Sequence, residues 1–202
     1  MPKRDPGHMA AVRQQILAAA RAVFERKGLY EASVSDISKE AGLSVGTLYV
    51  HFRSKEAILV ALIETAEVKG EVFAECDSAG ALLKLVETIL RRQEAPDMAA
   101  QAARTALEVA AIARRSAEVQ AVVVRNYEQM RGALLAAVSR INTQDAGLGP
   151  AEVLAIGESL LSLLIAAQSQ MLIGVPASTE AKIGAARMLI SRLHGAPVRK
   201  KR

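Results

Sequence analysis

Apolar residues recur every three or four positions along most of the chain, and no stretch keeps a strict alternation of apolar and polar residues. This spacing is typical of helices that bury one face, whereas a half-buried strand would repeat every second residue. The first long run, residues 13–27, places its apolar side chains on one helical stripe: Ile16, Leu17, Ala20, Val23 and Phe24. The pattern therefore predicts an all-α protein.

Glycines and serines mark where the first predicted helices end and begin. Gly28 and Gly42 are expected to end two of them, because glycine accepts the positive φ of a helix C-terminus. Ser33 and Ser44 are placed to accept hydrogen bonds from the first turns of the helices that follow. About nine helices are expected, over residues 13–27, 34–41, 45–52, 55–75, 81–94, 97–115, 117–142, 151–173 and 179–193.

Residues 37–52 hold the most informative arrangement, two short helices joined by a tight turn at Gly42. Ile37, Leu43 and Leu48 are spaced to lock these helices together, which leaves the outer face of the second helix exposed. Helices in this geometry let the second one enter the major groove of DNA while the first leans on the backbone. The spacing thus predicts a helix-turn-helix.

The sequence of residues 33–56, SVSDISKEAGLSVGTLYVHFRSKE, resembles the TetR family of transcriptional regulators. The matching residues keep the family's order and spacing, and they are Asp36, Ile37, Ala41, Gly42, Ser44, Gly46, Thr47, Leu48, Tyr49, His51, Phe52, Ser54, Lys55 and Glu56. The resemblance implies an N-terminal three-helix DNA-binding domain and a larger helical domain for ligand binding and dimerisation. We expect a flexible arm (1–9), a helix-turn-helix domain (10–56), the larger domain (57–195) and a basic disordered tail (196–202).

The same resemblance implies which residues contact DNA. They are Ser33, Ser35, Ser44, Val45, Gly46, Thr47, Tyr49, His51 and Lys55. Thr47, Tyr49 and His51 are expected to touch phosphates or base edges, and Lys55 a phosphate, although His51 also suits a plain surface position. Val45 and Gly46 are expected near the groove floor, whereas Leu48 and Phe52 are expected in the core.

Ser35 and Val45 depart from the family pattern, in which longer polar or basic residues are frequent at these two positions. Fewer hydrogen bonds to base edges are then expected. Contacts with thymine methyl groups and sequence-dependent DNA shape would supply part of the specificity.

The charge distribution fits a DNA-binding head. Residues 1–55 carry nine Lys and Arg against five Asp and Glu, and the whole chain has a formal net charge of +5. A basic segment on a larger body favours a polyanionic partner, although the same charges also suit a solvated surface.

Catalytic, metal and cofactor sites are not expected. The single cysteine, Cys76, has no recognised catalytic signature around it, and the sequence shows neither a Cys/His cluster nor a glycine-rich phosphate loop. No secretory signal is visible, so a cytoplasmic protein is predicted. Residues 153–175 form the one membrane candidate, but their polar side chains gather on one side, as in a core or interface helix.

The last two predicted helices are expected to form a homodimer interface. By resemblance to the family, they would pair with a second copy as a four-helix contact. Burial within one subunit is the alternative for some of their apolar side chains. The residues expected in the interface are Leu154, Leu161, Leu164, Ile165, Leu172, Ile183, Ala186, Ile190 and Leu193.

A small-molecule pocket in the larger domain is also implied by the resemblance. Only Phe73 and Tyr127 supply aromatic rings there, so an apolar, aliphatic ligand is expected rather than a planar cation. The expected lining is Phe73, Met98, Glu108, Tyr127, Met130, Gln168 and Met171, of which Tyr127, Gln168 and Glu108 are able to hold a polar end.

These inferences predict a dimeric repressor that binds a palindromic operator in double-stranded DNA and is released by a small-molecule inducer. Two alternatives stay open at this point. One is an activator or architectural DNA-binding protein without a ligand, and the other is a protein-interaction or membrane-associated helical module. Salt-dependent DNA binding would separate the last of these from the rest.

Overall fold

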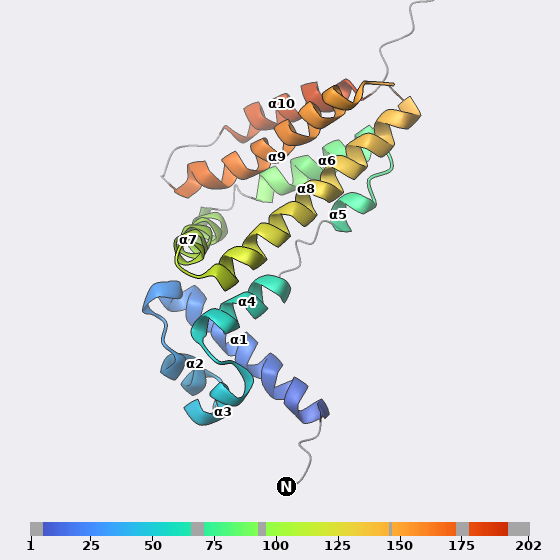
Figure 1. Cartoon of the computed structure of the whole chain (residues 1–202). Helices are drawn as coiled ribbons and strands as arrows, with labels where there is room; N and C mark the ends of the chain where they lie inside the picture. The colour runs from blue at the N-terminus through green and yellow to red at the C-terminus, as the bar shows by residue number, and fades with distance from the viewer. Residues whose placement is uncertain (1–5, 66–70, 93–95, 146, 173–177, 194–202) are drawn as a thin grey trace, which may run out of the picture. The chain divides into compact units, whose positions relative to one another are not determined.

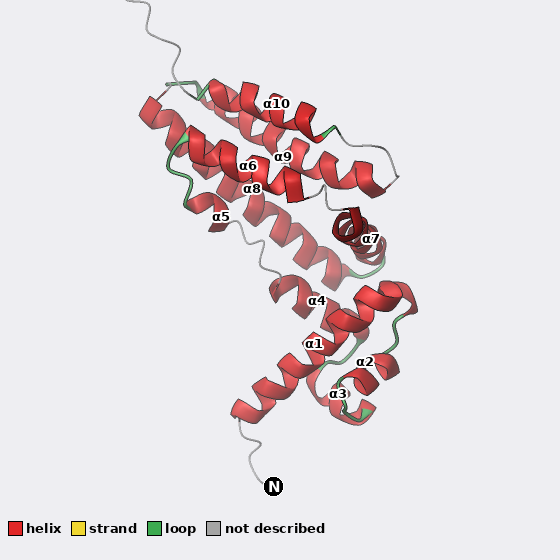
Figure 2. Cartoon of the chain, turned by 180° about the vertical axis from the view of Figure 1, so that it is seen from behind, coloured by secondary structure: helices red, strands yellow, loops and turns green. Residues whose placement is uncertain are grey.

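The computed structural model describes residues 6–65, 71–92, 96–145, 147–172 and 178–193, without the side chains of 71, 96–103, 143–145, 168, 169, 171 and 172. These residues form helices joined by turns and loops (Figure 2). The helices are α1 Pro6–Glu31, α2 Val34–Glu40, α3 Val45–His51, α4 Lys55–Thr65, α5 Glu71–Ala74, α6 Ala79–Arg92, α7 Pro96–Ala113, α8 Ala117–Asp145, α9 Pro150–Leu172 and α10 Thr179–Ser191 (Figure 1). The predicted all-α fold is confirmed.

Both ends of α1 differ from the expected helix. It begins at Pro6, inside the segment expected to be a flexible arm, because the fixed φ of proline suits the first helical position. Gly28 interrupts the helix, as expected, and a second, short helical segment follows it. The chain kinks there, with φ 82° and ψ 164°, and makes one more helical turn to Glu31. The kink uses the left-handed region that glycine enters at low cost.

The helix expected over residues 55–75 is two helices in the structure. Helix α4 ends at Thr65, α5 covers Glu71–Ala74, and residues 66–70 lie outside the described part. The described residues therefore form ten helices rather than about nine.

The chain divides into two compact units. The first contains residues 1–66 and 104–125, and the second contains residues 67–103 and 126–202. Helices α7 and α8 thus contribute residues to both units. The boundary expected between residues 56 and 57 falls within α4, which packs against α1 in the first unit.

The core of the first unit forms around the apolar stripe of α1. Ile16, Ala20 and Val23 are fully buried against Ile37 of α2 and Leu48 of α3. The same core also takes residues from α4 and from the parts of α7 and α8 that belong to this unit: Ile58, Leu59, Ala61, Val109, Ile112 and Val119. The two short helices of the predicted helix-turn-helix are therefore held from one side by a continuous apolar layer.

The second unit is a helical bundle in which α10 packs against both α6 and α9 (Figure 1). Its core contains Phe73, Leu82, Leu134, Leu160 and further apolar residues from α5, α6, α8, α9 and α10. Among the described residues, Pro150–Ala167 of α9 is long and apolar enough to cross a membrane by length and composition alone. A helix with one face in a protein core satisfies the same two measures, and α9 buries Leu160 and Leu161 in this way.

Replacement of the fully buried Leu160 by alanine is expected to destabilise the protein by about 2–5 kcal/mol, because it removes packing and leaves a cavity. Leu107→Ala is the matched control, since this leucine is 52% exposed and its truncation should change the free energy of unfolding by no more than about 0.5 kcal/mol. Urea unfolding followed by circular dichroism measures both. Equal losses in the two variants would contradict the core assigned here.

Candidate nucleic-acid interface

Helix α2 begins with a complete capping box. The Ser33 hydroxyl oxygen accepts from Asp36 N at 3.1 Å, and the Asp36 carboxylate accepts from Ser33 N at 3.0 Å. The Lys27 ammonium lies 2.8 Å from the same carboxylate. Together with the hydrogen bonds from Ser33, Lys27 holds the pKa of Asp36 well below its usual range. These contacts satisfy the open N–H groups of a helix too short to be stable by itself.

The turn between α2 and α3 has the geometry expected for Gly42. This residue has φ 64°, and the chain reverses so that Leu43 N donates to Ser38 O at 2.9 Å. Ser44 then caps α3, with its hydroxyl oxygen accepting from Thr47 N at 3.0 Å. The predicted helix-turn-helix is confirmed in its helices, its glycine turn and both serine caps.

The two residues of the motif expected in the core are found there. Leu48 is fully buried, and Phe52 is 3% exposed. Their burial fixes which side of α3 faces the rest of the unit. The opposite side is therefore free to meet a partner.

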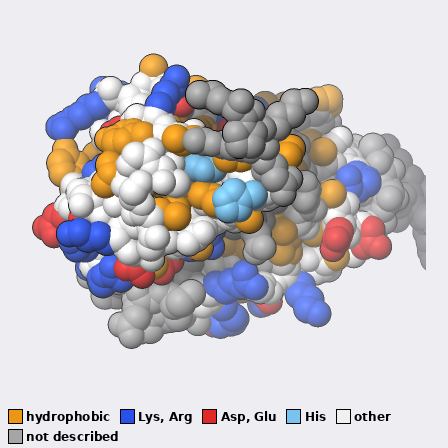
Figure 3. All heavy atoms as spheres, turned by 90° about the horizontal axis from the view of Figure 1, so that it is seen from below, with side chains coloured by type: hydrophobic (Ala, Val, Ile, Leu, Met, Phe, Trp, Pro, Cys, Tyr) orange, Lys and Arg blue, Asp and Glu red, His pale blue; other side chains and the backbone are white. Residues whose placement is uncertain are grey.

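The outer face of α3 is apolar and exposed. Val45, Tyr49 and Val50 are 40%, 52% and 49% exposed, and Gly46 lies between the first two without a side chain. Thr47 Oγ1 lies 2.9 Å from Ser44 Oγ, so this hydroxyl belongs to the cap. Seen from below, the molecule shows hydrophobic and histidine side chains near the middle, with Lys and Arg side chains toward the edges (Figure 3).

Helix α1 holds the C-terminal ends of both short helices. Gln15 donates to Ala41 O, the C-cap of α2, at 2.7 Å. Arg13 donates to His51 O at 3.4 Å, and its guanidinium carbon lies 4.2 Å from the centroid of the Phe52 ring. The sequence did not predict these contacts of Arg13 and Gln15. No local motif on α1 distinguishes a polar side chain that binds a neighbouring helix from one that is solvated.

Lys55 has an internal role in this structure. Its ammonium donates to Leu29 O at 2.8 Å, Tyr30 O at 3.4 Å and Ala32 O at 2.9 Å. It therefore caps the last turn of α1 with all three of its N–H bonds. Its contact with a phosphate stays a prediction. Ser33 and Ser35 are exposed on the α2 side of the same unit.

The residues expected to line a ligand pocket are divided between the two units, and only some of their side chains are described. Phe73 is buried in the core of the second unit, Met130 packs partly buried against that core, and Tyr127 is 38% exposed. Glu108 belongs to the first unit, where its carboxylate accepts from Leu29 N at 2.5 Å. The side chains of Met98, Gln168 and Met171 lie outside the described part.

The expected dimer interface needs a correction. Six of its residues are packed inside the second unit, so they cannot form an apolar surface for a partner: Leu161, Leu164, Ile183, Ala186, Ile190 and Leu193. Only the alternative of burial within one subunit fits them. Leu154 and Ile165 remain exposed, at 46% and 37%, and the side chain of Leu172 lies outside the described residues.

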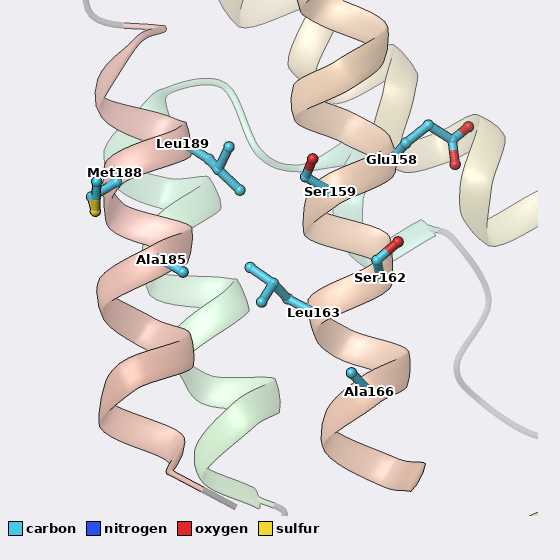
Figure 4. Close-up of a pocket in the computed structure, with 8 residues that line it drawn as sticks. All are labelled: Glu158, Ser159, Ser162, Leu163, Ala166, Ala185, Met188 and Leu189. Carbon is cyan, nitrogen blue, oxygen red and sulfur yellow. The ribbon is translucent and has the colours of Figure 1, made fainter. Parts of the chain in front are cut away.

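A different stripe of α9 and α10 is the accessible one. An open hollow of about 600 Å³ lies between these helices, lined by Glu158, Ser159, Ser162, Leu163, Ala166, Ala185, Met188 and Leu189. Leu163 from α9 and Leu189 from α10 point toward the space between the two helices (Figure 4). The i, i+3, i+4, i+7 spacing of residues 159–166 was readable in the sequence, but its small and polar members do not mark it as apolar.

Comparison with known proteins identifies the N-terminal part of the chain. The family model described as "Bacterial regulatory proteins, tetR family" matches residues 16–62. The HTH-type transcriptional regulator YvdT of Bacillus subtilis is 39% identical over 83 residues, which cover 38% of this chain and 41% of that protein. The chain thus matches less than half the length of this curated relative.

Two solved structures share the fold over nearly the whole chain. A TetR transcription regulator from Haloarcula marismortui has a TM-score of 0.72 at 18% identity, covering 90% of this chain and 97% of that one. The transcriptional regulator FadR from Bacillus subtilis, solved in complex with stearoyl-CoA, has a TM-score of 0.61 at 20% identity, covering 90% and 99%.

The capped pair α2 and α3, with its glycine turn and buried inner face, defines a helix-turn-helix protein. The match over residues 16–62 and the shared fold narrow this class to one kind of regulator. Residues 16–62 match the TetR family of bacterial regulatory proteins, and nearly the whole chain has the fold of a solved TetR regulator. The matched curated relative is a transcriptional regulator, in line with the expectation that the chain is not an enzyme.

The capping box makes the stability of the first unit sensitive to acid. The pKa of Asp36 is lower in the folded chain than in the unfolded chain, where it is about 3.9. The unfolded state therefore binds more protons between these two values, and stability falls as the pH is lowered through this range. In Asp36→Asn the fall below about pH 4 should be shallower, by up to one proton.

Urea midpoints measured at several acidic pH values give this slope. Lys27→Gln should show an intermediate slope, because Lys27 is the largest cause of the lowered pKa. An identical slope in wild type and Asp36→Asn would show that the box does not contribute.

Proposed function

We propose that this protein is a transcriptional repressor that binds a palindromic operator as a homodimer and is released by a small apolar molecule. The observation that carries the proposal is the outer face of α3. This face is exposed on a short helix that is capped by Ser44, anchored by Arg13 and locked by Leu48. A rigid helix of this kind is what insertion into the major groove requires.

The side chains on α3 favour one kind of base readout. Val45 offers only methyl groups, and methyl groups recognise the C5-methyl of thymine in the major groove. Gly46 allows the helix backbone to approach the bases closely, while Tyr49 and His51 are placed to contact phosphates or base edges. We therefore propose that the half-sites contain thymine opposite Val45, with DNA shape contributing to specificity.

A second copy of the chain is the proposed partner of the α9–α10 face. Met188 is 74% exposed, and it continues the apolar surface formed by Leu163 and Leu189 around the hollow. Leu154 and Ile165 on α9 are also exposed. A two-fold contact between such faces would set two α3 helices on one operator, which explains the proposed palindrome.

The proposed inducer is an aliphatic molecule bound in the larger domain. Support comes from the scarcity of aromatic residues there and from the fold shared with FadR of Bacillus subtilis, solved in complex with stearoyl-CoA. Of the residues expected to line it, Phe73 and Met130 belong to the apolar core of the second unit, where an aliphatic chain would bind. A repressor of this kind acts in the cytoplasm, where its DNA is.

The decisive experiment is selection of bound fragments from genomic and random DNA by the purified full-length protein, at physiological salt. We expect one enriched palindrome, with affinity that falls steeply as salt is raised. Thermal-shift screening should then find acyl compounds that stabilise the protein and release this operator. An absence of any sequence preference would refute the proposal, and strong operator binding with no compound that releases it would favour the activator or architectural alternative.

Gly46→Ala separates DNA binding from folding. An added Cβ would meet only Ser44 Oγ, at 3.7 Å, and alanine favours a helix by up to about 1 kcal/mol, so the melting temperature should stay or rise. The same Cβ should prevent close approach to the bases, with a loss of tenfold or more in operator affinity, on the order of 1.4 kcal/mol. Gly132→Ala on α8, where nothing lies within 4 Å, is the control expected to bind DNA normally. Wild-type affinity in Gly46→Ala would place the groove contact elsewhere.

Met188→Glu tests the proposed dimer face. The side chain is exposed in a single copy, so the variant should fold, but a charge buried against a partner is costly and should weaken the dimer by at least a hundredfold. Sedimentation velocity across a dilution series measures the dissociation constant. Val124→Glu, at a residue that is 51% exposed on α8, should leave the dimer intact. A dimer unaffected by Met188→Glu would exclude this face.

A further inference from the structure

The turn at residues 29–32, formed by the end of α1 and Ala32 after it, is held by charged side chains from other helices. It follows the kink at Gly28 and closes with a hydrogen bond from Ala32 N to Gly28 O at 3.3 Å. One isolated turn is unstable in water, because nucleation costs more than a single hydrogen bond returns. Leu29 and Ala32 are nevertheless 2% exposed, so the turn is a fixed part of the first unit.

Its two ends carry opposite charges in the order that a helix dipole favours. At the start, Leu29 N donates to the carboxylate of Glu108 on α7 at 2.5 Å. At the end, the Lys55 ammonium of α4 donates hydrogen bonds to Leu29 O at 2.8 Å and to Ala32 O at 2.9 Å. A carboxylate at the open N–H groups and a cation at the open carbonyls are each favourable.

Two further features fit this turn to α7. A Cβ at residue 28 would come within 2.9 Å of a Glu108 carboxylate oxygen, so glycine is needed both for its φ of 82° and for the space that the carboxylate occupies. Arg115, just after α7, donates to the Tyr30 hydroxyl at 2.6 Å. The turn is thus hydrogen-bonded by three charged groups: the Glu108 carboxylate, the Lys55 ammonium and the Arg115 guanidinium.

The turn leads directly into the helix-turn-helix. Ser33, the N-cap of α2, follows Ala32, whose carbonyl is bound by Lys55. Helix α2 in turn packs against α3 through the layer that contains Ile37 and Leu48. A displacement of the turn would therefore shift the cap of α2 and, through the packed layer, the outer face of α3.

We propose that Glu108 is a positioning residue for DNA binding: its carboxylate, with Lys55 at the opposite end, fixes the turn at residues 29–32 and so sets the placement of α2 and α3. This inference deepens the proposed function, because it assigns to α7 the point through which the recognition face is held. It also explains why Glu108, which the sequence suggested for a ligand pocket, is used inside the first unit.

The test compares full-length Glu108→Ala and Glu108→Gln with wild type. Glu108→Ala leaves Leu29 N without an acceptor and should lower affinity for the selected operator on the order of tenfold, a typical size for coupling between parts of one protein. Glu108→Gln keeps an oxygen that accepts this hydrogen bond and should recover part of the loss. Affinity is measured by fluorescence anisotropy well below the melting temperature of every variant. Glu128→Gln, an exposed carboxylate on α8, is the control.

A second readout does not depend on DNA. Amide hydrogen exchange at residues 29–36 should be faster in Glu108→Ala and unchanged in the control. If wild type selects no operator, the proposed function fails while exchange still decides the role of Glu108. The inference is overturned if exchange at residues 29–36 is unchanged, or if Glu108→Ala only lowers the melting temperature and binds the operator as wild type does.

Discussion

The shortness of α2 and α3 is the constraint on which the rest of the first unit depends. Each has seven residues, and a helix of that length does not persist alone in water. Serine caps satisfy their N-termini, and Gln15 and Arg13 reach their C-terminal carbonyls from α1. The apolar layer around Leu48 then joins these local contacts to one core. Rigidity of the recognition face thus comes from neighbours rather than from the helices themselves.

Much of this arrangement could be predicted from the sequence, because its signals are local. The capping serines, the turn at Gly42 and the inward positions of Leu48 and Phe52 all follow from residue type and spacing within a few residues. The family resemblance came from residues 33–56, which lie within the segment 16–62 that the family model matches. The continuation of α1 past Gly28 was not predictable in this way, because the acceptor for Leu29 N comes from Glu108, far along the chain.

The second unit shows what periodicity leaves undetermined. Regular apolar spacing identified α9 and α10 as amphipathic, but it could not tell a face buried within one chain from a face for a partner. Leu161 and Ile190 lie in the core, whereas the accessible stripe combines serines with Leu163 and Leu189. Both kinds of face repeat at the same helical period, so only the packing of α6 and α10 against α9 separates them.

The composition of the two units has a consequence for how the chain acquires its structure. The first unit is discontinuous: its core includes Val119, which is fully buried and lies beyond a long stretch that belongs to the second unit. During synthesis, the segment through residue 66 emerges well before the residues that complete this core. The helix-turn-helix consequently cannot reach its final packing as an early, independent module, and a fragment cut after α4 would expose an unfinished apolar surface.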